Sequence, residues 1–133
     1  MRRAALVPSV LAVAVLAAPA AAQEGAPSGQ AMVLWEILWE RTATEETQAV
    51  LRFIAPAVGA EADAPGPEAV QADMDWLCET HGRPLARLPY ARTDVVVVSV
   101  MDRPVPRGAT EPEATQYFGL YRIEDGGCAP QDY

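Results

Sequence analysis

Asp94-Val95-Val96-Val97-Val98-Ser99-Val100-Met101-Asp102 is the stretch that decides the fold. Between its two aspartates the residues are apolar or small, and most are β-branched. A strand that is covered on both faces needs such a run, because no position faces water. We therefore expect the central strand of a sheet at residues 95–101.

Three other segments alternate with the period of two that is typical of strands. These segments are 31–40, 49–57 and 116–123. We expect the first two to pair antiparallel through the loop 41–48. In segment 31–40 the alternation places Trp35 and Trp39 on one face, but a helix remains the alternative because both would also share a helical face.

The clearest helix begins at Pro67, since proline suits the first helical position and Glu68 complements the positive end of the helix dipole. One stripe of this helix is formed by Val70, Met74, Leu77 and His81. Gly82 and Pro84 are expected to end the helix. The sequence thus predicts an α+β fold, with this helix on a mostly antiparallel four-stranded sheet in the order strand-strand-helix-strand-strand.

The first 22 residues have the three parts of a cleavable signal peptide. A basic start at Arg2-Arg3 precedes an apolar run, and small residues lead up to a cut after Ala22. The run is shorter than the ~20 residues that span a bilayer, so no stable membrane anchor is expected after cleavage. Residues 23–30, rich in Gly, Ala, Pro and Ser, are expected to be a flexible lead-in to a single domain at 31–133.

Charge disfavours two classes of partner. All ten basic residues are Arg, and eight of them remain after the signal against eighteen acidic residues, a net charge of −10. Such a chain is repelled by phosphate backbones and by anionic lipid. The lack of Lys and the abundance of Ala indicate a GC-rich bacterial genome. The predicted location is periplasmic or secreted.

Cys78 and Cys128 are expected to form a disulfide, because an even pair in a small exported domain oxidises. Closing a loop of that length stabilises a fold by about 4 kcal/mol in the chain-entropy model. Two free thiols or a lone metal-binding pair are the alternatives. The two residues do not form a CxxC motif, which gives little support to oxidoreductase chemistry.

Several segments carry a resemblance to a known family. They are 71–80 (QADMDWLCET), 102–105 (DRPV), 112–118 (PEATQYF), 121–126 (YRIEDG) and Cys128. These resemble a family of small exported alphaproteobacterial proteins of unknown function, whose members are sometimes labelled acetolactate synthase. The resemblance spans nearly the whole mature chain and implies an uncharacterised envelope domain with no catalytic residues to carry over. We reject the synthase label, since a thiamine-dependent enzyme needs several large domains.

The titratable candidates for a site have structural explanations. His81 is a possible general base, but no nucleophile motif accompanies it, and its position suits the end of a helix. Asp73, Asp75 and Glu79 are calcium-type ligands by chemistry. Asp73 and Asp75 point in nearly opposite directions on a helix, which argues against a metal-binding cluster. Asp75 and Glu79 share a face with Glu68, and we expect that face to be a solvated acidic ridge, with no metal and no cofactor.

Aromatic residues are the better candidates for binding. Trp35, Trp39 and Trp76, together with His81, are the predicted interaction residues, and the Trp35–Trp39 pair would lead if its strand is exposed. The leading hypothesis is a non-enzymatic periplasmic domain that binds another protein or an envelope component. The alternative is a small periplasmic hydrolase or an inhibitor of one.

Overall fold

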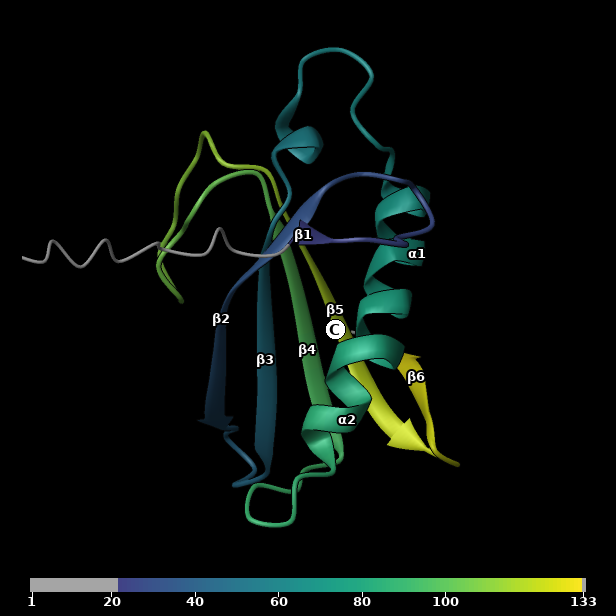
Figure 1. Ribbon diagram of the computed structural model, residues 1–133. Coiled ribbons are helices and arrows are strands. Elements are labelled where there is room, and N and C mark those ends of the chain that lie inside the picture. The colour runs from purple at the N-terminus through teal and green to yellow at the C-terminus, as the bar shows by residue number, and fades with distance from the viewer. Residues whose placement is uncertain (1–21, 133) are drawn as a thin grey trace, which may run out of the picture.

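A computed structural model describes residues 22–132 of the chain. The predicted signal peptide therefore lies outside the described residues, apart from Ala22. Within the described range, one layer of helix packs on one face of a single twisted sheet (Figure 1).

The strands follow one another across the sheet in the order in which they occur in the chain. They are β1 (Ala22–Gln23), β2 (Met32–Arg41), β3 (Thr47–Ile54), β4 (Val95–Met101), β5 (Gln116–Glu124) and β6 (Gly127–Gln131). Neighbours are antiparallel except β3 and β4, which are parallel. A parallel pair requires a crossover connection, and the helical segments between β3 and β4 supply it.

These helical segments form one nearly continuous helix after a short 3₁₀ turn. Their bounds are η1 (Pro56–Gly59), α1 (Pro67–Leu77), η2 (Cys78–Gly82) and α2 (Arg83–Ala86). The expected stop at Gly82 and Pro84 is therefore wrong. Segment η2 is a wide π turn, and Pro84 follows it in the first turn of α2, where a missing N–H does not break the helical ladder.

Gly82 has a packing role where the helix crosses β4. A Cβ on Gly82 would lie 2.8 Å from Cγ1 of Val96, closer than two carbon atoms can approach. The φ angle of Gly82 is −70°, so the residue is not a left-handed helix cap. Glycine is needed because the helix lies against the central strand.

The α+β class and the mostly antiparallel sheet are confirmed, but the four-stranded count and the strand order are wrong. Beside the two-residue β1, the described residues hold five longer strands, and β6 was not among the four strands expected from the sequence. Strand β6 is hard to recognise in the sequence because it contains Gly127 and Pro130. Both residues are unusual in strands, and proline is tolerated mainly at a sheet edge. Strand β4 lies between β3 and β5, and all seven of its residues are buried.

The hydrophobic core lies between the helix and the sheet. Its largest contributors are Met32, Leu51, Phe53, Val70, Met74, Leu77, Val96, Val98, Val100 and Tyr121. Gly119 makes room for the ring of Tyr121, because a Cβ at Gly119 would lie 2.7 Å from that ring. The hydroxyl of Tyr121 donates a hydrogen bond to Asp75 on α1 at 2.7 Å, which joins helix and sheet.

Asp73 ties the segment before β2 to the helix. Its carboxylate is fully buried and accepts hydrogen bonds from the backbone N–H of Ser28 at 2.9 Å, from the Ser28 hydroxyl and from Nε2 of Gln30 at 2.6 Å. Composition alone favoured a flexible lead-in at 23–30 and gave no sign of these bonds. The alternation of polar residues along α1 likewise gave no reason to bury Asp73.

A disulfide joins Cys78 of η2 to Cys128 of β6, with a sequence separation of 50. It fastens the helix, at the point where α1 passes into η2, to the last strand. No helix among residues 22–132 combines the length and the hydrophobicity needed to cross a bilayer.

Replacing both cysteines by alanine is expected to lower the free energy of unfolding by about 4 kcal/mol, because the unfolded chain regains the entropy of the open loop. Urea denaturation of the oxidised protein and of the double variant measures this difference. Reduction of the unaltered protein should give a similar loss. An unchanged denaturation midpoint in both cases would show that the bond does not stabilise the fold.

Candidate functional site: an aromatic sheet edge beside a charged cavity

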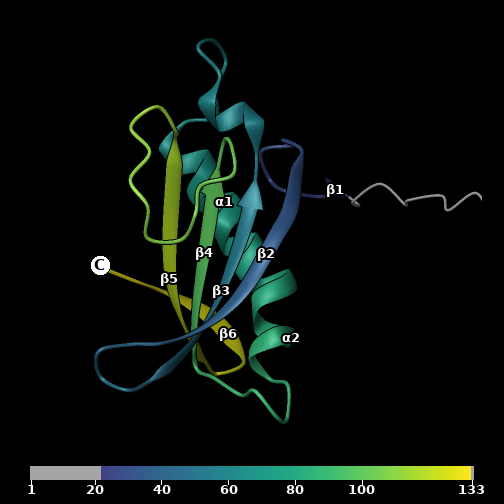
Figure 2. The ribbon, with the colours of Figure 1, turned by 90° about the vertical axis from the view of Figure 1, so that its left-hand side faces the viewer.

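The face of the sheet that points away from the helices, called the open face here, carries the polar groups of the candidate site. Figure 2 shows the 102–115 loop, the turn between β2 and β3 and the C-terminal end all projecting on this side. Alternation along the strands places Arg52, Ser99 and Phe118 in one row across β3, β4 and β5.

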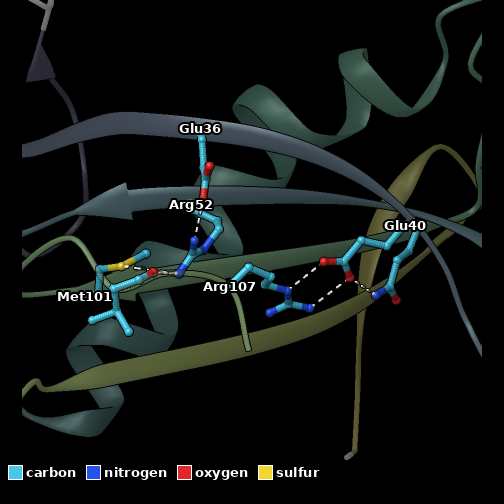
Figure 3. A network of polar contacts seen from close by, with 7 residues as sticks. Glu36, Glu40, Arg52, Met101 and Arg107 are labelled. Atoms are coloured by element: carbon cyan, nitrogen blue, oxygen red, sulfur yellow. Dashed lines mark hydrogen bonds and ion pairs between the residues drawn. The ribbon is translucent and has the colours of Figure 1, made fainter. Parts of the chain in front are cut away.

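Arg52 is a buried cation at the centre of this face, with only 1% of its surface exposed (Figure 3). One guanidinium nitrogen pairs with Glu36 of β2, and the other donates to the carbonyl of Val105 in the 102–115 loop. The second nitrogen also lies 3.7 Å from the sulfur of Met101. The guanidinium carbon stacks 4.9 Å from the centre of the Trp35 ring. Arg52 thus holds β2, β3 and the 102–115 loop together.

A second arginine, Arg107, fastens the 102–115 loop to the open face. Arg107 makes a bidentate pair with Glu40 of β2, at 2.8 and 3.0 Å, and Gln48 also donates to Glu40 at 2.9 Å (Figure 3). The hydrogen bond from Arg107 lowers the pKa of the Glu40 carboxyl, against the opposing effect of burial. Glu40 is therefore ionised at neutral pH and holds the loop by charge.

A cavity of about 610 Å³ opens between this loop and the sheet. Its lining includes Glu40, Arg52, Arg107, Gln116 and Phe118, the last of which is 42% exposed. Within residues 22–132, Nε of Arg52 has no hydrogen-bond partner. The lining of the cavity therefore includes an aromatic side chain and two paired arginines.

The outer strand of the main sheet, β2, exposes large apolar side chains that we call the aromatic edge: Trp35 at 40%, Ile37 at 39% and Trp39 at 40%. Single exposed apolar residues are common, but three within five positions of one strand are not. Figure 1 shows why they remain exposed: β2 lies at the side of the sheet that the helix does not cover.

A β-bulge divides the aromatic edge between two faces. Pairing with β3 shifts between Leu34 and Glu36, so the extra residue is Trp35. Trp35 consequently contacts Arg52 on the open face, whereas Ile37 and Trp39 lie opposite Leu51 and Ala49 on the helix side. The simple alternation in the sequence placed Trp35 and Trp39 together, which the bulge prevents.

The other two predicted interaction residues pack against the core. The ring of His81 lies 5.9 Å from that of Trp76 and 6.0 Å from that of Phe53. Burial lowers the pKa of His81, and its Nε2 atom has no hydrogen-bond partner within the described part of the chain. Trp76 is half-buried against the core. The structure therefore brings His81 and Trp76 together against the core.

The three carboxylates on the helix bind three different sets of partners. Asp73 holds Ser28 and Gln30, Asp75 accepts from Tyr121, and Glu79 pairs with Arg83 at 3.1 Å. Glu79 also accepts from the backbone N–H of Cys128 at 2.5 Å. Across residues 22–132, His, Cys, Asp and Glu side chains form no group of three that could hold a metal ion.

Sequence reasoning missed Arg52, Glu40, Arg107 and Phe118. A signal for Arg52 was present, because it interrupts the apolar run Val50-Leu51-Arg52-Phe53 on a predicted strand. A lone arginine there indicates either an exposed face or a buried ion pair. Arg107 lies 67 residues from Glu40, and no local pattern connects the two.

The chain belongs to a family of unknown function, DUF6497, whose model matches residues 10–133. The match covers both the aromatic edge and the charged cavity. The search of curated proteins gave no match. The search of solved structures gave none either.

Replacing Arg52 by methionine is expected to lower the free energy of unfolding by about 2–3 kcal/mol, because Glu36 and the Val105 carbonyl lose their partner. The measurement is urea denaturation followed by tryptophan fluorescence. Arg41→Met is the matched control: its side chain is 71% exposed and pairs with Glu45, which is 84% exposed, so a change within about 0.5 kcal/mol is expected. Equal losses in the two variants would contradict the role given to Arg52.

The stability contributed by His81 should depend on pH. Its pKa is lowered by burial from the ordinary 6.5, so the unfolded chain binds a proton more readily than the folded one. The contribution is therefore complete above pH 6.5 and is lost as pH falls through the lower pKa of the folded state. His81→Phe should flatten the dependence of the urea midpoint on pH between about 7 and 5. Parallel curves for the two proteins would count against this account.

Proposed function

We propose that this chain is an exported, non-enzymatic binding domain that docks another protein chain on the outer edge of β2. The observation that carries the proposal is the aromatic edge, which combines Trp35, Ile37 and Trp39 at about 40% exposure each on one outer strand. Ile37 and Trp39 lie on the same face of this strand, and exposed apolar side chains grouped in this way mark interaction surfaces. Tryptophan is enriched among the residues that dominate binding energy.

The backbone of β2 supports the same proposal. Strand β1 pairs with β2 at Met32 and Val33, and within residues 22–132 no strand pairs with its outer side from Leu34 onward. An uncovered strand presents N–H and C=O groups that an extended segment can pair with, while pockets beside it select side chains. A partner that adds a strand here would use both the backbone and the aromatic edge.

Export and a protein partner are supported by the chemistry of the chain. The leader has the parts of a signal peptide, and the Cys78–Cys128 disulfide suits an oxidising compartment. A net charge of −10 after the leader favours a protein partner over nucleic acid or anionic lipid. The hydrolase alternative gains no support from His81, whose ring contacts are with Phe53 and Trp76.

The proposal is tested by replacing Trp39 with a photo-crosslinking phenylalanine analogue in the source cell. Irradiation should give a discrete adduct of the mature chain, which begins at Gln23, in the envelope fraction. The matched control carries the analogue at Tyr90, which is 87% exposed but lies in a loop after α2, and should give no such adduct.

Two results would contradict the proposal. Identical crosslinked adducts from the analogue at Trp39 and at Tyr90 would show that the aromatic edge has no special role in binding. Recovery of the chain in the cytosol with Met1 attached would remove export.

A further inference from the structure

We infer that the segment docking on β2 is β2 of a second copy of this chain, so that two sheets join antiparallel into one. This inference rests on the proposed function and names the partner for the same edge. Its basis is the self-complementary order of side chains along residues 34–41, together with the ion pairs that already neutralise the charges on this strand.

The geometry of an antiparallel pair limits the possible registers. If helices of both copies lie on the same side, residues on the same face must lie opposite each other. Placing Leu38 on the two-fold axis sets Ile37 opposite Trp39 of the second copy, and Trp39 opposite Ile37 of the second copy. All four side chains lie on the helix side, where each is about 40% exposed in the single chain.

The neighbouring registers are less complementary. With Ile37 on the axis, Trp39 would lie opposite Trp35 of the second copy, which the bulge has turned to the open face. With Trp39 on the axis, Leu38 would lie opposite the carboxylate of Glu40 of the second copy. Leu38 on the axis instead sets leucine against leucine on the open face, and it makes two aromatic–aliphatic pairs on the other.

The glutamates of β2 are already paired with arginines of their own chain, which permits such pairing between copies. In the Leu38 register Glu36 lies opposite Glu40 of the second copy, and two like charges there would oppose association. Within one chain, however, Arg52 already pairs with Glu36 and Arg107 with Glu40. Outer strands are usually guarded from self-pairing by unpaired charge. Here the negative charge of each glutamate that could oppose self-pairing is balanced by an arginine of its own chain.

The net charge of each copy acts in the opposite direction. Two chains with a net charge of −10 repel each other at long range, and salt screens that repulsion. Association through the aromatic edge should therefore strengthen as ionic strength rises. A contact formed by ion pairs between copies would weaken instead.

The test uses the mature, disulfide-bonded chain in analytical ultracentrifugation over a range of concentrations and salt. A monomer–dimer equilibrium that tightens with salt is expected. Trp39→Glu should weaken dimerisation by about thirtyfold or more, the effect of losing one dominant interface residue. Tyr90→Glu adds the same charge at a site away from the edge and should leave the dimer unchanged.

Cysteine crosslinking tests the register independently of those variants. Leu38→Cys should form a covalent dimer under mild oxidation, because the two Cβ atoms on the axis would be about 5 Å apart. Arg41→Cys should not, since its two copies would be separated by six strand residues, about 20 Å. A covalent dimer from Arg41→Cys and none from Leu38→Cys would overturn the register.

The outcomes separate this inference from the function on which it rests. A chain that stays monomeric at every concentration, while Trp39 crosslinks to a different envelope protein, overturns self-pairing and leaves the binding function standing. A dimer that persists in Trp39→Glu overturns the assigned edge. A monomer with no adduct at Trp39 overturns both.

Discussion

The open face of this protein is organised by the need to satisfy one buried charge. Arg52 lies within the sheet at 1% exposure, where an unpaired guanidinium would be far too costly to bury. Three of its partners come from two segments: Glu36 and the ring of Trp35 from β2, and the Val105 carbonyl from the 102–115 loop. The bulge at Trp35 allows both Trp35 and Glu36 to reach the same guanidinium. The path of the loop and the local shape of β2 both follow from this requirement.

The two faces of the sheet are stabilised in different ways. On the helix side, close packing decides which residues fit, as Gly82 against Val96 and Gly119 beneath Tyr121 show. On the open face, ion pairs and hydrogen bonds position a loop over a cavity. Strand β2 contributes to both faces. Its glutamates complete the polar network of the open face, and its apolar side chains remain exposed at the edge of the sheet. The candidate site therefore lies on β2, where the polar network and the exposed apolar side chains adjoin.

The fold class was predictable because it depends on local pattern, whereas the site depends on distant contacts. The valine run of β4 and the apolar stripe of α1 are visible in the sequence, and both are where they were expected. The helix continues past Gly82 and Pro84 because a π turn accommodates the proline, which composition does not reveal. Strand β6 was missed because Gly127 and Pro130 argue against a strand, although an outer position permits them. Trp35 and Trp39 lie on one strand, as the alternation predicted, but the bulge that separates them has no sequence signature. Arg107 and Glu40 meet only through the fold.

The Cys78–Cys128 bond also determines how the domain would respond to mechanical tension. A pull applied at Gln23 and Gln131 passes from the helix into β6 through the sulfur bridge and never along the chain between the cysteines. The 49 residues between the cysteines, which include β4 and β5, would bear no tension even after the rest of the fold had unfolded. About 170 Å of contour length is thereby withheld from extension. Under such tension the domain would extend mainly through the part of the chain before Cys78 until the bridge was reduced.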